Sequence, residues 1–418
     1  MISGRDIVLI SSIEWDLLWQ HPQEIATRFS RAGNRVLYVE NMGVRSLTLR
    51  DAGRVFRRIA SWTKSLGSHG VRPVGPHLSV CSPLILPPFG PTWRRYVNRR
   101  VLLPIVHRSA QNLGIHDPLI WIHLPTDSAL ELVRFFRTPR STVVYYCIAD
   151  FARLTPYASE IRQSEEQIVK ESDLVLANSS RLADHCRQWR TDVHVSPPGV
   201  NLDAFPRDFK KDDGATRKEL ERLWEARNIR SVRRSPLDPI IGYVGGLHRH
   251  VAFRLVEEMA RARPHWLWVF IGPKQTRLGR LATLPNVLLL GHRPHGELAR
   301  YIRSFDVCIA PYLDNPETAT VVPVKINEYL AAGKPVVCTE LSSILEQRQW
   351  HDVLTKAAAR PEIFLSAIEE ALRSPNGEVA IARRRQVAEL ADWDRRLQAM
   401  ADLIEDRDKA VETSTGTR

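Results

Sequence analysis

The chain alternates short apolar runs with longer amphipathic stretches, and this alternation starts twice along the sequence. Such a pattern predicts parallel strands joined by helices, so we expect two doubly wound α/β domains. A charged stretch closed by Pro236 and Pro239 separates the two series. Because parallel sheets bind ligands beyond the carboxyl ends of their strands, we expect a site in a cleft between the domains. The expected strands are 7–11, 35–39, 78–81, 119–123, 143–148, 174–177, 193–195, 240–244, 268–271, 287–290, 307–310 and 335–338.

Length and composition limit the class of protein. A chain of 418 residues exceeds one core of ordinary size, and 44% hydrophobic with 25% charged residues is typical of globular proteins. No apolar run approaches the roughly 18 residues that span a bilayer, and the first residues lack the features of a signal peptide. We therefore expect a cytoplasmic protein. Its five scattered cysteines predict reduced core residues, not a disulfide or zinc framework.

The net charge of +12 is concentrated in one segment. Residues 45–108 contain twelve lysines and arginines against the single acid Asp51, which gives +11. Such a block suggests an anionic partner: lipid headgroups, a phosphorylated acceptor or nucleic acid. Two parts of it, 55–66 and 93–101, have helical periodicity and a tryptophan, and basic helices of this kind can lie in a membrane interface. The alternative is that both apolar stripes pack on the core.

The most informative stretch runs from Asp306 to Val337. After a buried strand and a loop it reads Pro-Val-Lys-Ile-Asn-Glu-Tyr-Leu-Ala-Ala-Gly-Lys-Pro-Val-Val. Pro323 suits a first helical turn, and backbone amides at the start of that helix could bind a diphosphate. Lys325 and Glu328 are spaced to share a helix face, where a lysine can neutralise phosphate and a carboxylate can accept ribose hydroxyls. The alternative is a surface ion pair on an ordinary helix.

This stretch resembles the donor-binding signature of GT-B glycosyltransferases of the bacterial polysaccharide-biosynthesis type (group 1), specifically here and weakly over nearly the whole chain. The resemblance implies that Glu328 holds the nucleotide ribose and that Tyr312, Thr320 and Val322 belong to the donor site. Retaining relatives carry a glutamate eight positions before the ribose glutamate, where this chain has Thr320. The spacing of Lys325 and Glu328 is closer to inverting enzymes similar to xanthan-type glucuronosyltransferases, in which the lysine contacts the phosphates.

A second motif, Ile-Ile-Gly-Tyr-Val-Gly-Gly-Leu-His-Arg-His at 240–250, is a strand that enters a glycine turn. It lacks the spacing of a nicotinamide-binding fingerprint. The resemblance implies that this turn faces the donor diphosphate. Gly245 and Gly246 would permit close backbone approach, and His248 or Arg249 could reach a phosphate. The alternative is a tight turn with exposed basic side chains.

Candidate acceptor-side residues follow strands of the first half. Asp150 ends the run Val-Val-Tyr-Tyr-Cys-Ile-Ala-Asp and could deprotonate an acceptor hydroxyl, a role that the resemblance also implies; the alternative is a helix cap. Asp16, in the loop after the first strand, is the second choice for this base. Trp15 in the same loop could stack on a sugar or pack in the core. His123 could face the acceptor or serve a structural role.

The resemblance also implies the organisation and the reaction. We expect a Rossmann-like acceptor-binding domain at 1–205, a linker at 206–238, a Rossmann-like nucleotide-sugar-binding domain at 239–385, and a helix at 386–418 that crosses back to the first domain. The expected reaction is inverting transfer of a sugar from a nucleotide-diphosphate sugar to a polyprenyl-diphosphate-linked saccharide, for cell-surface polysaccharide or exopolysaccharide. The enzyme would work without metal or cofactor, as a peripheral protein on the inner face of the cell membrane.

Two alternatives remain open. A nucleotide-sugar epimerase of the same architecture would need no membrane. A nucleic-acid-binding protein is suggested by charge alone, because no recognition motif accompanies the basic block. A retaining transfer also remains possible.

Overall fold

The computed structural model describes residues 1–16, 19–40, 71–83, 85–86, 89, 92–206, 214–227, 235, 237–319 and 321–415, with side chains to residue 409. The expected helix at 55–66 and Thr320 of the expected donor site lie outside the described residues. The chain divides into two compact units: Met1–Pro197 with Asp394–Arg418 form unit 1, and Pro198–Trp393 form unit 2. The first boundary therefore falls at Pro197, before the expected position 205.

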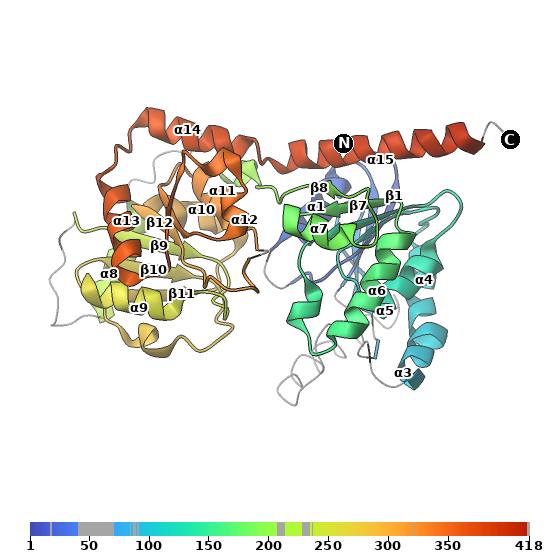
Figure 1. Cartoon of the computed structure of the whole chain (residues 1–418), viewed down its shortest axis with the longest axis horizontal. Coiled ribbons are helices and arrows are strands. Elements are labelled where there is room, and N and C mark those ends of the chain that lie inside the picture. The colour runs from blue at the N-terminus through green and yellow to red at the C-terminus, as the bar shows by residue number, and fades with distance from the viewer. Residues whose placement is uncertain are drawn as a thin grey trace. The chain divides into compact units, whose positions relative to one another are not determined.

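Unit 1 is built on an eight-stranded sheet with the order β3-β4-β2-β1-β5-β6-β7-β8. Figure 1 labels its strands β1, β7 and β8. The pair β3–β4 is antiparallel, and the other neighbouring pairs are parallel. Strands β5, β6 and β7 are buried at every position, as expected of parallel strands covered on both faces. The strands are β1 (Asp6–Ile10), β2 (Arg35–Val39), β3 (Val71–Gly75), β4 (Leu78–Cys81), β5 (Leu119–Ile122), β6 (Thr142–Cys147), β7 (Leu174–Ala177) and β8 (His194–Val195).

Helices connect the parallel strands of unit 1. Side-chain caps fix two of their starts, because the Thr126 and Ser179 hydroxyls accept hydrogen bonds from the backbone N–H groups of Ala129 and Leu182. The described helices are α1 (His21–Arg31), α3 (Thr92–Val97), the π-helical turn η2 (Asn98–Leu102), α4 (Leu103–Asn112), α5 (Asp127–Phe136), η3 (Phe151–Leu154), α6 (Ala158–Glu171) and α7 (Ser180–Arg187).

Unit 2 has a six-stranded parallel sheet with the order β11-β10-β9-β12-β13-β14. The direction of strand succession reverses between β9 and β12, which is the place where doubly wound sheets bind ligands. Its strands are β9 (Ile240–Val244), β10 (Leu267–Ile271), β11 (Val287–Gly291), β12 (Val307–Ala310), β13 (Val336–Thr339) and β14 (Leu354–Ala357). Its described helices are η4 (Leu202–Ala204), α8 (Ala215–Arg227), α9 (Phe253–Ala262), η5 (Gly279–Thr283), α10 (His295–Ser304), α11 (Lys325–Ala331), α12 (Ser342–Leu345), η6 (Arg348–Trp350), α13 (Pro361–Arg373) and α14 (Glu378–Glu389).

The stretch expected as a linker is partly structured. Helix α8 lies within it and contributes Leu220 and Trp224 to the apolar core of unit 2. The expected linker therefore belongs to unit 2 and contributes to its core.

Helix α15 (Trp393–Thr415) follows unit 2 in the sequence, yet from Asp394 onward it belongs to unit 1. At its start Asp394 pairs with Arg28, a buried residue of α1. Near its end Asp408 pairs with Arg5 at 2.9 Å. These contacts confirm the predicted return of the C-terminal helix to the first domain.

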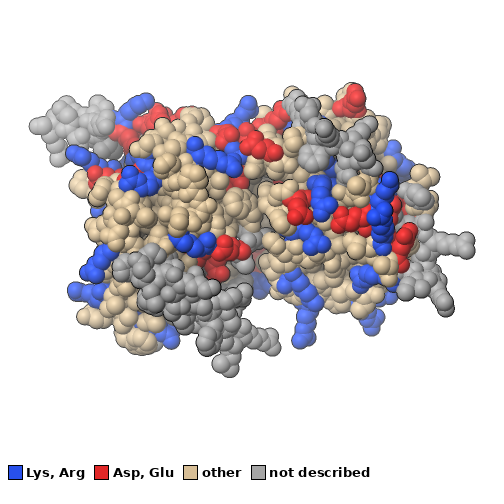
Figure 2. Space-filling view, turned by 180° about the vertical axis from the view of Figure 1, so that it is seen from behind, with Lys and Arg blue, Asp and Glu red and all other residues tan. Residues whose placement is uncertain are grey.

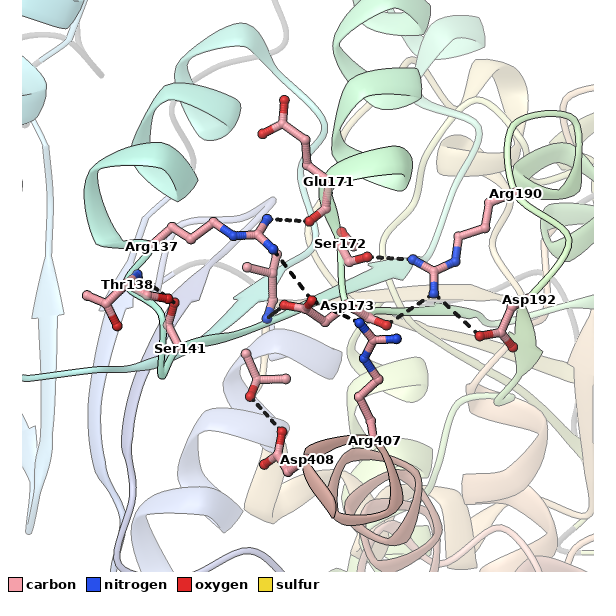
Figure 3. Close-up of polar contacts among 12 residues, drawn as sticks. Arg137, Thr138, Ser141, Glu171, Ser172, Asp173, Arg190, Asp192, Arg407 and Asp408 are labelled. Carbon is pink, nitrogen blue, oxygen red and sulfur yellow. Dashed lines mark hydrogen bonds and ion pairs between the residues drawn. The ribbon is translucent and has the colours of Figure 1, made fainter. Parts of the chain in front are cut away.

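Figure 3 shows how α15 is tied to the sheet of unit 1. Asp173, directly before β7, accepts a hydrogen bond from the Val143 backbone N–H at 2.9 Å. Its other oxygen lies 3.5 Å from Arg137 and 3.3 Å from Arg407 of α15. One carboxylate thus joins two strand starts and the returning helix.

Candidate active site

Two glycine turns meet at the carboxyl ends of β9 and β10. Gly245 has a φ of 134° and Gly272 a φ of 144°, a region that favours glycine. A Cβ atom on Gly272 would lie 2.0 Å from the Gly245 carbonyl oxygen, so the turns pack backbone against backbone. The carbonyl of the next residue, Gly246, accepts a hydrogen bond from the Tyr243 hydroxyl at 3.0 Å. The turn is therefore held in one conformation by close backbone contact.

Lys325 lies directly against this turn. A Cβ atom on Gly245 would be 2.7 Å from Lys325 Nζ. The lysine is only 9% exposed; its Nζ donates to the Tyr243 hydroxyl at 2.7 Å and lies 5.2 Å from the ring centroid of Tyr312. Within the described part of the chain, no carboxylate pairs with this ammonium group. Because a buried charge without a counter-charge is costly, the position is suited to an anion.

Glu328 lies one turn further along α11 and has a different partner. Its Oε1 is 3.3 Å from Nε2 of His295, the first residue of α10. No motif pointed to His295, because the contact joins residues 33 positions apart and depends on how two helices pack. Lys325 and Glu328 thus contact different groups, unlike the mutual surface ion pair of the alternative interpretation.

Both ends of the segment that leads into α11 contain buried residues. Tyr312 is 4% exposed and Val322 is 6% exposed. The prediction that the helix begins at Pro323 is wrong: α11 begins at Lys325 with Val324 as its N-cap. The physical reason is a tighter turn, since the Pro323 carbonyl accepts from the backbone N–H three residues later, at 3.1 Å.

The basic side chains after the glycine turn differ in charge. Burial, together with the nearby lysine, lowers the pKa of His248 to about 3, so its imidazole is neutral at neutral pH. Its Nδ1 accepts from the His250 backbone N–H at 3.3 Å, which places the ring proton on Nε2. Arg249 is exposed and pairs with Glu317 at 2.9 Å. His248 can therefore donate a hydrogen bond without adding charge, whereas the charge of Arg249 is already paired.

Asp150 follows β6 at the carboxyl edge of the unit 1 sheet. It occupies the N-cap of η3, but its side chain makes no cap hydrogen bond, so the capping alternative is not supported. Its Oδ2 accepts from Arg153 Nε at 2.7 Å. Its Oδ1 is buried and has no hydrogen-bond partner among the described residues, an arrangement that is energetically unfavourable. Asp150 therefore keeps one acceptor atom available for a hydroxyl group.

Asp16, the second candidate for the base, lies exposed to solvent in the loop after β1. The Asp16 side chain is 76% exposed and accepts from Arg72 at 2.5 Å. Trp15 packs edge-on against Tyr38 with 5.0 Å between ring centroids. These environments favour Asp150 over Asp16 as the base and favour the packing alternative for Trp15.

His123 lies in the core of unit 1. It has no exposed surface, its Nε2 accepts from Trp121 Nε1 at 3.2 Å, and burial lowers its pKa to about 3. These observations favour the structural alternative for this histidine over contact with an acceptor.

All five cysteines are free and buried, as predicted. Cys147 and Cys186 lie with Glu165 in a group whose ligand-type atoms are within 4.8 Å of one another. The Glu165 carboxylate, however, already accepts from the Tyr145 hydroxyl at 2.6 Å and lies 2.9 Å from His185 Nε2. The hydrogen bond to Cys186 and burial raise the pKa of the Cys147 thiol well above its ordinary value, which disfavours the thiolate. We interpret the group as core packing.

A basic helical segment exposes aromatic side chains. In α3 and η2, Trp93 is 56% exposed, Tyr96 64% and Val101 53%. Arg94 lies 5.6 Å from the Trp93 ring centroid, and Arg100 lies 5.8 Å from that of Tyr96. The second of the two predicted apolar stripes therefore does not pack on the core. No helix within the described ranges has the length and hydrophobicity to cross a bilayer.

Known proteins resemble this chain in fold and, over part of unit 2, in sequence. Residues 238–374 match the sequence model of the family described as glycosyl transferases group 1, and this range contains the glycine turn, Lys325 and Glu328. Two Rossmann-like units with parallel sheets match the solved structures of GT-B glycosyltransferases. The chain therefore has a GT-B fold, and residues 238–374 are similar to group 1 glycosyltransferases, in line with the sequence resemblance.

Individual relatives cover different shares of the chain. The glycosyltransferase TuaH of Bacillus subtilis (strain 168), assigned to teichuronic acid biosynthesis, is 27% identical over 241 residues, which are 56% of this chain and 57% of that protein. Sucrose-phosphate synthase from Thermosynechococcus elongatus aligns over 97% of this chain and 100% of its own, with 16% identity and a TM-score of 0.68. Anabaena HepE in complex with UDP and glucose aligns over 96% and 99%, with 14% identity and a TM-score of 0.61.

Proposed function

We propose that this protein transfers a sugar from a nucleotide-diphosphate sugar to a saccharide acceptor in polysaccharide biosynthesis. The family match, the relative from teichuronic acid biosynthesis and the fold shared with a UDP-bound protein support this function. The comparisons do not favour the epimerase alternative. On the face seen in Figure 2, lysines and arginines are interspersed with acids, which does not favour a nucleic-acid-binding surface there.

The observation that carries the proposal is Lys325, a buried ammonium group held against the Gly245 turn and left without a carboxylate partner among the described residues. In the proposed complex it binds the donor diphosphate, and His248 donates from Nε2. Glu328, beside His295, accepts the ribose hydroxyls. Because a lysine and backbone amides can stabilise the departing diphosphate, the proposal needs neither metal nor cofactor.

The proposed reaction is a single displacement with Asp150 as general base. The acceptor hydroxyl oxygen attacks the anomeric carbon while the bond from that carbon to the diphosphate oxygen breaks. The hydroxyl proton passes to Asp150, the nucleoside diphosphate leaves, and the anomeric configuration inverts. Thr320, where the resemblance places a glutamate in retaining enzymes, supports inversion.

We further propose a lipid-linked acceptor and a membrane-surface location. Exposed Trp93 and Tyr96 on an arginine-rich helix have the composition of an interfacial segment, and their arginines would attract anionic headgroups. In sedimentation with phosphatidylglycerol vesicles, Trp93→Ser with Tyr96→Ser should weaken binding. The matched control is Leu237→Ser, at a 92% exposed apolar position in unit 2. Equal binding of both variants would contradict this surface.

The function is tested by incubating the chain with UDP-, GDP-, TDP- and ADP-sugars, with and without polyprenyl-diphosphate-linked saccharides. We expect one donor to be consumed only when an acceptor is present, with a product of inverted configuration by NMR. Epimerised donor without acceptor would support the epimerase instead. A product of retained configuration would remove Asp150 from the role of base.

A further inference from the structure

Asn178, directly after β7, forms hydrogen bonds with the backbone at the carboxyl end of the neighbouring strand β6. Its backbone N–H donates to the Cys147 carbonyl at 3.0 Å, and its Nδ2 donates to the Ile148 carbonyl at 2.9 Å. The second bond fixes the orientation of the amide, because a carbonyl accepts only from the nitrogen end. The opposite end, Asn178 Oδ1, is buried and has no hydrogen-bond partner in the described part of the chain.

This oxygen and the unpartnered oxygen of Asp150 belong to residues that follow two neighbouring strands. Strands β6 and β7 are parallel neighbours with Cys147 opposite Ala177, and such strands are about 4.8 Å apart. Asp150 follows Ile148 by two residues, so the two oxygens sit on adjacent strand ends at the carboxyl edge of one sheet. Two buried acceptors without donors are unfavourable, and this edge is where doubly wound sheets bind ligands.

We propose that Asn178 and Asp150 together bind a vicinal diol of the saccharide acceptor. Asp150 Oδ1 accepts the proton of the reacting hydroxyl, and Asn178 Oδ1 accepts a hydrogen bond from the hydroxyl on the neighbouring carbon. A diol fits because both protein atoms accept, neither donates, and each sugar hydroxyl can donate. No bond is made or broken at Asn178, which acts as an acceptor-binding residue. The inference rests on the proposed function, with Asp150 as base.

Access to this pair lies at the strand exit. Both oxygens are covered in the structure, and Asn178 is only 4% exposed. Ile148 and Asp150 are half-buried, however, and Arg153, which holds the other Asp150 oxygen, is 45% exposed. The proposed complex therefore requires the partly exposed residues after β6 to move and uncover the two oxygens.

The test compares acceptors that differ by one hydroxyl. The chain is given its best nucleotide-sugar donor with octyl hexosides, and with the monodeoxy analogue that lacks the hydroxyl next to the accepting one. For the unmodified chain we expect kcat/KM to be about 10-fold lower with the deoxy acceptor, since one buried hydrogen bond is lost. In Asn178→Ala this preference should disappear. The control Ser179→Ala removes a helix-capping hydroxyl next to Asn178 and should keep the preference.

A merely structural Asn178 would change both acceptors equally, so the ratio separates the two roles. An Asn178→Ala chain that keeps the 10-fold preference would overturn the inference. The same result is expected if only water, and not the acceptor, pairs with Asn178 Oδ1. If Asn178→Ala does not fold, the unmodified chain is given monodeoxy acceptors that lack a hydroxyl elsewhere on the ring. These should keep their kcat/KM, and an equal loss at every ring position would overturn the inference. No transfer by the unmodified chain to any acceptor would instead contradict the proposed function.

Discussion

The proposed donor side of unit 2 and the strand ends of unit 1 present opposite chemistry. At the glycine turn, Lys325 contacts Tyr243 and the backbone of Gly245, and one buried positive charge is left without an acid. At the exit of β6, Asp150 and Asn178 each keep one oxygen without a donor. One side therefore offers a cation and the other offers hydrogen-bond acceptors. This difference suggests how one chain could distinguish its two substrates. A cation would select the phosphate-bearing donor, and hydrogen-bond acceptors would select the hydroxyl-bearing acceptor.

The strongest way to break this comparison is to remove the base. Asp150→Asn should lower kcat for glycosyl transfer about 10²- to 10⁴-fold, because an amide cannot take the hydroxyl proton. Nucleotide affinity, measured by calorimetry, should not change, since the donor contacts lie in unit 2. The matched control is Asp16→Asn, which alters an exposed acid paired with Arg72 and should leave kcat nearly intact. A large loss of kcat in Asp16→Asn, with none in Asp150→Asn, would identify Asp16 and not Asp150 as the base.

The donor side is tested next by removing its charge. Lys325→Met should weaken nucleotide-sugar binding about 10- to 100-fold, since a hydrogen bond to a charged group is worth about 1.5–3 kcal/mol. Folding stability should be unchanged or higher, because an apolar side chain of similar volume replaces a buried cation. Calorimetry and urea unfolding measure the two quantities. Weaker binding that merely follows a large loss of stability would show that Lys325 has only a structural role.

A smaller effect is expected at the ribose. Glu328→Gln should weaken nucleotide binding about 10-fold, because a neutral amide is a poorer acceptor for two hydroxyls than a carboxylate. His295→Gln should cost less, since His295 acts on the ribose only through Glu328. Affinities for a nucleotide and its 2′-deoxy form should converge in Glu328→Gln. If the two forms still differ in affinity for Glu328→Gln as they do for the unmodified chain, Glu328 does not bind the ribose.

The last effect is on folding stability alone and concerns pH and the neutral His248. Its pKa of about 3 in the folded chain lies below the ordinary value of 6.5, so below pH 6.5 the unfolded chain binds more protons. The free energy of unfolding should therefore fall as pH drops from 6.5 towards 3, by at most about 1.4 kcal/mol per pH unit from this group. His248→Gln should lose less stability over this range in urea unfolding. The exposed His292→Gln should behave like the unmodified chain, and identical slopes for all three would contradict the burial of His248.

The sequence identified the central strands well because of where they lie. Predicted runs 174–177 and 307–310 coincide with β7 and β12, since strands buried on both faces are apolar throughout. Strands β3 and β14 were not predicted. Both are edge strands of their sheets, and half-buried polar residues, such as Arg72 and Lys356, interrupt the apolar pattern.

The donor motif could be recognised from spacing, but its contacts could not. Lys325 meets Tyr243, which is 82 positions earlier, and Glu328 meets His295 through the packing of two helices. Asn178 gave no signal at all, because a single asparagine after a strand has no pattern. Its significance depends on one hydrogen bond to the neighbouring strand.

The central claim is that unit 2 binds a nucleotide-diphosphate sugar through Lys325 and Glu328. Its most direct measurement is calorimetric titration of the whole chain with UDP-, GDP-, TDP- and ADP-sugars, repeated with Lys325→Met. We predict that at least one nucleotide sugar binds and that Lys325→Met weakens its binding while the protein stays folded. Failure of every nucleotide sugar to bind the folded, unmodified chain would contradict the account.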